Sequence, residues 1–157
     1  MENYNCKSAI ILGMHDAIVS LTGLIAGLFF AFTDTNIIVI SCILSSITAS
    51  LSMGASNYLA VKSVNANKAL SAALYTGIAY MATCILLVLP FLIFSDTNYF
   101  ALISVILTVI LIIFFFNLFF YRKRKFYKHF FEMLSICTIV SIIAFFIGDF
   151  ASKFIGT

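Results

Sequence analysis

The sequence predicts an all-α membrane protein with five transmembrane helices. Of its 157 residues, 63% are hydrophobic and 10% are charged, and the mean hydropathy is +1.15, so the surface of a water-soluble domain could not be covered. The apolar residues form five long segments, and about 20 helical residues suffice to cross a bilayer core of roughly 30 Å. Continuous apolar runs such as Val109–Phe116 lack the alternation of a barrel strand, which favours helices.

The five segments follow one another with only short polar stretches between them. We expect helices over residues 8–32, 36–62, 68–94, 99–121 and 129–153. Because every connection is short, neighbouring helices run antiparallel and no soluble domain is inserted. We therefore expect residues 1–157 to form a single transmembrane domain.

The distribution of the cations predicts the orientation of the helices. With a cytoplasmic N-terminus, eight of the nine cations lie inside and only Lys153 lies outside, while the opposite loops carry Asp34 and Asp96. The eight are Lys7, Lys62, Lys68, Arg122, Lys123, Arg124, Lys125 and Lys128. The positive-inside rule thus places the N-terminus in the cytoplasm and, after five spans, the C-terminus outside.

The first segment carries an acid, Asp16, at membrane depth. A charged side chain is costly there, so Asp16 is a candidate functional residue. Small and polar residues recur at spacings of three and four on the same face, namely Gly13, Asp16, Ser20, Gly23 and Gly27. The Gly23–Gly27 element has the G-x-x-x-G spacing that permits close helix packing and would suit the axis of a dimer. His15 points about 100° away from Asp16, and it is either a partner of that acid or a packing residue.

The second segment offers a soft metal ligand, Met53, at a matching depth. Asp16 lies eight residues after Ser8 and Met53 eight residues before Val61, so each is about 12 Å from the same end at 1.5 Å per residue. A thioether suits a transition metal and not magnesium or calcium. Two copies related by a two-fold axis would supply two carboxylates and two thioethers for a divalent ion. Further small or polar residues on this helix face are Ser46, Ala49, Ser50 and Asn57, and Gly54 is a candidate for helix packing or for a dimer contact.

The remaining polar residues have two possible roles each. Ser20, Ser50 and Asn57 could add oxygen ligands, although the simpler interpretation of Asn57 is a polar group near a helix end. His129 and Glu132 form either a solvated helix start or a vestibule through which metal arrives. Asp149 and Lys153, spaced i, i+4, predict a local ion pair.

The last three segments are rich in Phe, Ile and Leu and are predicted to form a lipid-facing wall, with Pro90 bending the end of the third segment.

The cysteines show no C-x-x-C spacing and are expected to act as small apolar residues. The basic run 122–125 is too short to suggest a nucleic-acid partner. No nucleophile constellation or H-E-x-x-H helix accompanies the acids, so we do not expect an enzyme.

Two motifs resemble the vacuolar iron transporter family. The first is Asp16-Ala17-Ile18-Val19-Ser20 leading into Gly23–Gly27, and the second is Ser52-Met53-Gly54 followed by Tyr58-Leu59. The resemblance implies export of Fe²⁺ or Mn²⁺ from the cytosol by a homodimer, along a path between the subunits that Asp16 and Met53 line.

The chain departs from the family pattern at three places. Ala17 stands where the family usually has glycine, and Ser45 stands where many members carry a glutamate. Only residues 63–67 occupy the position of the metal-binding domain of plant and fungal members. The chain is therefore similar to the shorter, nodulin-like and prokaryotic branch.

These observations together predict a transporter. We expect a homodimer in the lipid bilayer that exports Fe²⁺ or Mn²⁺ by proton exchange. The high content of Lys, Asn, Ile and Phe suggests an AT-rich and bacterial genome, and hence a bacterial inner membrane. The metals are substrates, and no permanent cofactor is expected. The alternative is a membrane scaffold that retains the fold without transporting, as the missing acid at Ser45 would allow.

Overall fold

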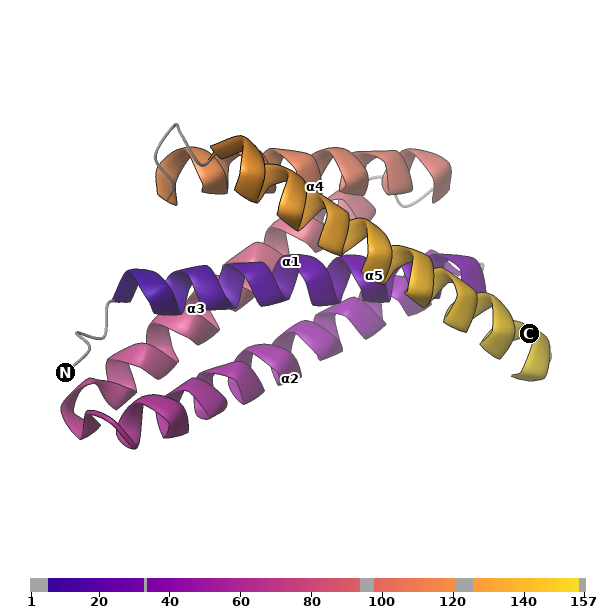
Figure 1. Cartoon of the computed structure of the whole chain (residues 1–157). Helices are drawn as coiled ribbons and strands as arrows, with labels where there is room; N and C mark the ends of the chain where they lie inside the picture. Colours follow the sequence, from indigo (N-terminus) through magenta and orange to yellow (C-terminus); the bar gives the residue numbers. More distant parts are fainter. Residues whose placement is uncertain (1–5, 33, 94–97, 121–125, 156–157) are drawn as a thin grey trace.

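The chain folds into five helices in the computed structural model, which describes residues 6–32, 34–93, 98–120 and 126–155 (Figure 1). The helices are α1 (Cys6–Ala31), α2 (Thr35–Lys62), α3 (Ala66–Ile93), α4 (Asn98–Phe120) and α5 (Phe126–Ile155). Asp34 caps the start of α2, because its carboxylate accepts a hydrogen bond of 2.8 Å from the backbone N–H of Asn36. The basic run 122–125 and the predicted loop at 95–97 lie outside the described residues.

The five predicted helices are confirmed, with ends that differ from the predicted ones by three residues or fewer. Among the described residues, α1, α2, α3 and α5 are long and apolar enough to cross a membrane. In α4 the described apolar stretch is Ile103–Phe119, within a helix of 23 residues that extends about 34 Å at 1.5 Å per residue. The protein is therefore an all-helical, multi-pass membrane protein.

Helices α1 and α3 form the centre of the arrangement (Figure 1). Helix α2 packs along α3, α5 crosses α1, and α4 lies against α3 and α5. The starts of α1, α3 and α5 lie toward one end of the molecule together with the end of α2. Lys7, Lys62, Lys68 and Lys128 sit close to those helix ends, so the fold gathers on one side the four described cations of the eight from which the orientation was predicted.

The prediction that α3 belongs to a lipid-facing wall is wrong. One face of α3 is buried along its whole length, at Ala69, Ala72, Thr76, Tyr80, Thr83, Cys84 and Leu87. The small residues at spacings of three and four let α1 and α2 approach this face closely. Helix α5 does agree with the prediction, since large side chains such as Phe154, with 82% of its surface exposed, point away from the other helices.

Glycines allow the helices to cross in contact. A side chain on Gly13 would overlap the backbone oxygen of Thr76, and one on Gly54 would lie 3.2 Å from that of Ala73. A Cβ on Gly77 would likewise lie 3.3 Å from the backbone oxygen of Ser50. These contacts set the close packing of α1 on α3 and of α2 on α3.

The expectation that the G-x-x-x-G element of α1 lies on a dimer axis is wrong, because α5 of the same chain covers it. A Cβ on Gly23 would lie 2.7 Å from a methyl group of Val140, and one on Gly27 would lie 3.2 Å from the backbone oxygen of Ala144. Gly148 of α5 in turn packs against the backbone of Gly27. The element is a helix-packing site, as its spacing predicted, but within one subunit.

Candidate functional site

Asp16 lies near the middle of α1 on a face that the other helices of the chain leave uncovered. Ser8, Leu12 and Ser20 are exposed on the same face, one helical turn apart from each other and from Asp16. Asp16 follows Cys6, the first residue of α1, by ten positions, or about 15 Å along the helix. A carboxyl group is therefore presented at membrane depth on the outer surface of a single subunit.

Polar groups from three helices converge beside this acid. The hydroxyl groups of Ser20 and Tyr80 are hydrogen-bonded at 2.7 Å, and Asp16 is close enough to act electrostatically on Tyr80 and Cys84. The side chain of Ser46 on α2 is hydrogen-bonded to the thiol of Cys84. Its hydroxyl also donates a hydrogen bond of 2.6 Å to the backbone oxygen of Cys42. Asp16 thus borders a small polar region inside an otherwise apolar bundle.

Sequence reasoning missed the contribution of α3 to this region. Thr76, Tyr80 and Cys84 lie one turn apart on the buried face of α3. Their spacing of four was visible in the sequence and signals a polar stripe. The abundance of large apolar residues elsewhere in the segment concealed it.

Met53 is half-buried and packs against the main hydrophobic cluster, to which Ala17 and Ile18 of α1 belong. Those two residues directly follow Asp16 in the chain. Met53 therefore faces the core of the bundle, whereas Asp16 lies on the exposed face of α1. The shared depth of Asp16 and Met53 stays a prediction.

Asn57 connects three helices. Its side-chain amide donates to the hydroxyl of Thr76 at 2.5 Å and to the backbone oxygen of Ala72 at 3.4 Å. The hydroxyl of Thr76 in turn donates a hydrogen bond of 3.2 Å to the backbone oxygen of Ala9 on α1. Asn57 is 9% exposed, so these are buried bonds between α2, α3 and α1. The structure thus gives Asn57 a role in helix packing that the sequence did not predict, and its role as an oxygen ligand stays a prediction.

The two serines of α2 that sequence reasoning singled out have local contacts. The hydroxyl of Ser50 donates to the backbone oxygen of Ile47 at 2.9 Å. Ser45 is half-exposed, and its backbone oxygen accepts a bond of 3.1 Å from Thr48. Each hydroxyl oxygen keeps lone pairs that could face an ion.

His15 turns toward α4 and α5. Its ring lies edge-on to Phe116, with 4.7 Å between ring centroids, and the charges of His129 and Glu132 act on it. Within the described part of the chain, the buried Nε2 of His15 has no hydrogen-bond partner. The structure thus places His15 in the packing between helices, with one ring nitrogen unused.

One subunit by itself provides a sparse set of metal ligands near Asp16. Among the described residues, no three His, Cys, Asp or Glu side chains are grouped so as to hold a metal ion. The donors that the chain would offer are the carboxylate of Asp16, the thioether of Met53, if it shares the depth of Asp16 as predicted, and hydroxyl groups such as that of Ser20. A second copy of the chain would double each of them.

Comparison with known proteins identifies the part of the chain that carries these residues. Residues 7–70, which cover nearly all of α1, all of α2 and the start of α3, match the model of the VIT family. The comparison with curated proteins gave no match. The resemblance to the vacuolar iron transporter family is thereby confirmed over the segment that contains Asp16, Ser45, Met53 and Asn57.

Proposed function

Because residues 7–70 of this membrane protein match the VIT family, we propose that it exports Fe²⁺ and Mn²⁺ from the cytosol in exchange for protons. The observation that carries the proposal is the position of Asp16, a carboxyl group inside a transmembrane helix on a face that its own subunit leaves open. Ionisable residues in membrane spans are rare and mark ion or proton pathways. The gathering of cations at one end supports a cytoplasmic N-terminus, and we assign the protein to a bacterial inner membrane.

Asp16 acts as both ion ligand and proton carrier in this proposal. A carboxyl group must release its proton before it can bind a metal ion, so metal binding and proton binding exclude each other. Metal arriving from the cytosol displaces the proton, and a proton from the other side displaces the metal. This competition at one group couples the two flows.

The metal site is completed by a second copy of the chain. Leaving the Asp16 face against lipid would be costly, and a two-fold partner placed there would cover it. The pair would contribute two Asp16 carboxylates, whose charge balances a divalent cation, and two Met53 thioethers, which suit a first-row transition metal. Because α5 occupies the Gly23–Gly27 face, we place the two-fold axis along the Ser8–Ser20 face of α1.

The presence of Ser45 at a position where an acid would strengthen the site favours one alternative, a non-transporting scaffold. The two functions differ in their need for Asp16. A transporter requires the carboxyl group, whereas a scaffold depends on the close helix contacts and tolerates Asp16→Asn.

The experiment measures Mn²⁺ and Fe²⁺ flux into proteoliposomes with an imposed pH gradient. Wild type is compared with Asp16→Asn and with Asp149→Asn, a matched control whose acid forms an exposed ion pair with Lys153 at 2.7 Å at the far end of α5. We expect flux in wild type and the control and none in Asp16→Asn. Flux that persists without the pH gradient would refute proton coupling. A folded wild-type protein without any flux would refute transport and favour the non-transporting scaffold.

A further inference from the structure

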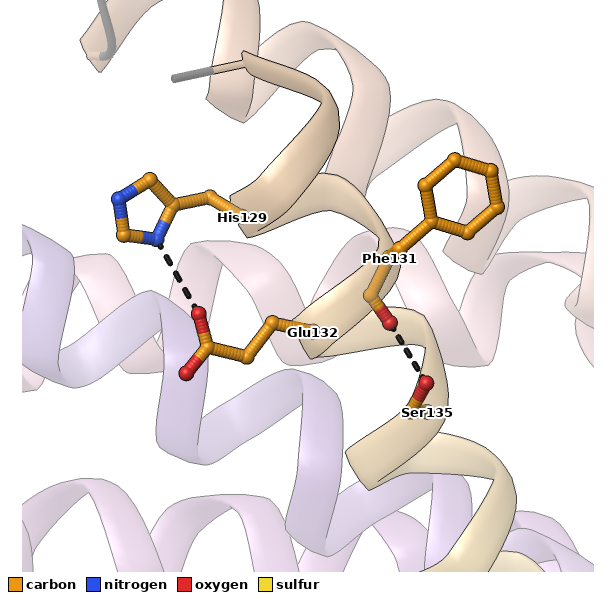
Figure 2. A network of polar contacts seen from close by, with 4 residues as sticks. All are labelled: His129, Phe131, Glu132 and Ser135. Atoms are coloured by element: carbon orange, nitrogen blue, oxygen red, sulfur yellow. Dashed lines mark hydrogen bonds and ion pairs between the residues drawn. The ribbon is translucent and has the colours of Figure 1, made fainter.

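A second pair of metal-ligating side chains lies at the start of α5, away from Asp16. The imidazole Nδ1 of His129 is 3.5 Å from the carboxylate Oε2 of Glu132, and their side chains are 30% and 56% exposed. Figure 2 shows both side chains extending from the same side of α5, with the two polar groups facing each other. The residues are three positions apart, which brings them onto one helix face.

The spacing of the two atoms fits a bound metal ion. Ligand atoms about 2.1 Å from a tetrahedral metal are separated from each other by about 3.4 Å. The observed 3.5 Å therefore matches the separation of two atoms that bind one ion. Their exposure leaves room for water molecules to fill the remaining positions. One imidazole and one carboxylate suit Mn²⁺, Fe²⁺ and Zn²⁺ better than Mg²⁺.

The pair is connected to the transport acid through α1. His15 lies close enough to His129 and Glu132 to be influenced by both charges, and it directly precedes Asp16. Among the residues that the structure describes, the buried Nε2 of His15 has no hydrogen-bond partner.

We propose that His129 and Glu132 form a capture site that binds the divalent transition-metal ion at the cytosolic end of the bundle before it reaches Asp16. The role in capture rests on the proposed transport function, whereas the binding site itself can be tested without transport. The site would supply, from two side chains of one helix, the cytosolic binding step for which the chain has no inserted domain between α2 and α3.

The test measures Mn²⁺ binding to the full-length chain in detergent, from the paramagnetic resonance signal of free Mn²⁺. Every protein carries Asp16→Asn, so that neither transport nor the Asp16 site contributes. The compared variants add His129→Gln with Glu132→Gln, or Asp149→Asn as the control acid on the same helix. We expect one bound Mn²⁺ per chain in the background and control, and at least about tenfold weaker binding in the double substitution. Excess Mg²⁺ should not displace the bound Mn²⁺.

Equal binding with and without the pair would refute the site, and so would the absence of binding in the background. Displacement of Mn²⁺ by excess Mg²⁺ would refute the transition-metal preference. In the transport assay, Glu132→Gln should raise the KM for Mn²⁺ by about tenfold and leave the maximal flux unchanged. Absence of flux in wild type would instead refute the transport function and leave the binding result standing.

Discussion

Replacing Asn57 by alanine distinguishes a helix-packing residue from a metal ligand. The substitution removes the bonds of 2.5 Å to Thr76 and 3.4 Å to Ala72 and leaves a small cavity between α2 and α3. Side-chain hydrogen bonds between membrane helices contribute about 0.6 kcal/mol on average and about 1.7 kcal/mol at most. With one short and one long bond lost, we expect the free energy of unfolding to fall by about 1–3 kcal/mol.

The assay is reversible unfolding in a titration with denaturing detergent, followed by far-UV circular dichroism, together with flux per folded molecule. A matched control is Ser56→Ala, which alters an exposed neighbour on α2 and should change stability by less than about 0.5 kcal/mol. For the packing role, Asn57→Ala loses stability and its folded fraction keeps its flux. Unchanged stability together with lost flux would refute the packing role and indicate that Asn57 is a metal ligand.

Thr76→Val tests the same connection from the other side. It removes the acceptor for Asn57 and the donor to Ala9. Because the two residues share one bond, the double substitution Asn57→Ala with Thr76→Val should destabilise by less than the sum of the single effects. Full additivity in the same unfolding assay would show that the bond is not made.

Two further substitutions test the helix contacts around the site. Tyr80→Phe removes the hydroxyl bonded to Ser20 and should lower the free energy of unfolding by about 1 kcal/mol in the detergent titration; no change would show that the 2.7 Å contact contributes nothing. Gly148→Leu places a side chain into the backbone of Gly27 and should abolish the folded state seen by size-exclusion chromatography. Ile147→Leu, at an exposed neighbouring position, should leave the elution profile unchanged, and normal folding of Gly148→Leu would refute the α1–α5 contact.

The sequence by itself determined the membrane class, the five helices and their limits. This succeeded because bilayer thickness fixes the length of an apolar segment, and because polar stretches as short as Ser63–Asn65 can only be turns. The i, i+4 pair of Asp149 and Lys153 was predictable for the same reason, since it depends on the local geometry of one helix. Asp16 was visible because a single acid stands out in an apolar segment.

Only the tertiary structure decided which face of each helix meets which neighbour. In a membrane, lipid is as apolar as a leucine side chain, so hydrophobicity does not distinguish a buried face from an exposed one. For this reason the sequence led us to predict that α3 faces the lipid. In the structure, the small and polar residues of α3 are buried at the centre of the bundle. The Gly23–Gly27 element was likewise correctly identified as a packing site, but its partner is α5 of the same chain and not a second copy. The spacing of the glycines along the sequence predicts a close helix contact. Only the packed structure shows which helix makes that contact.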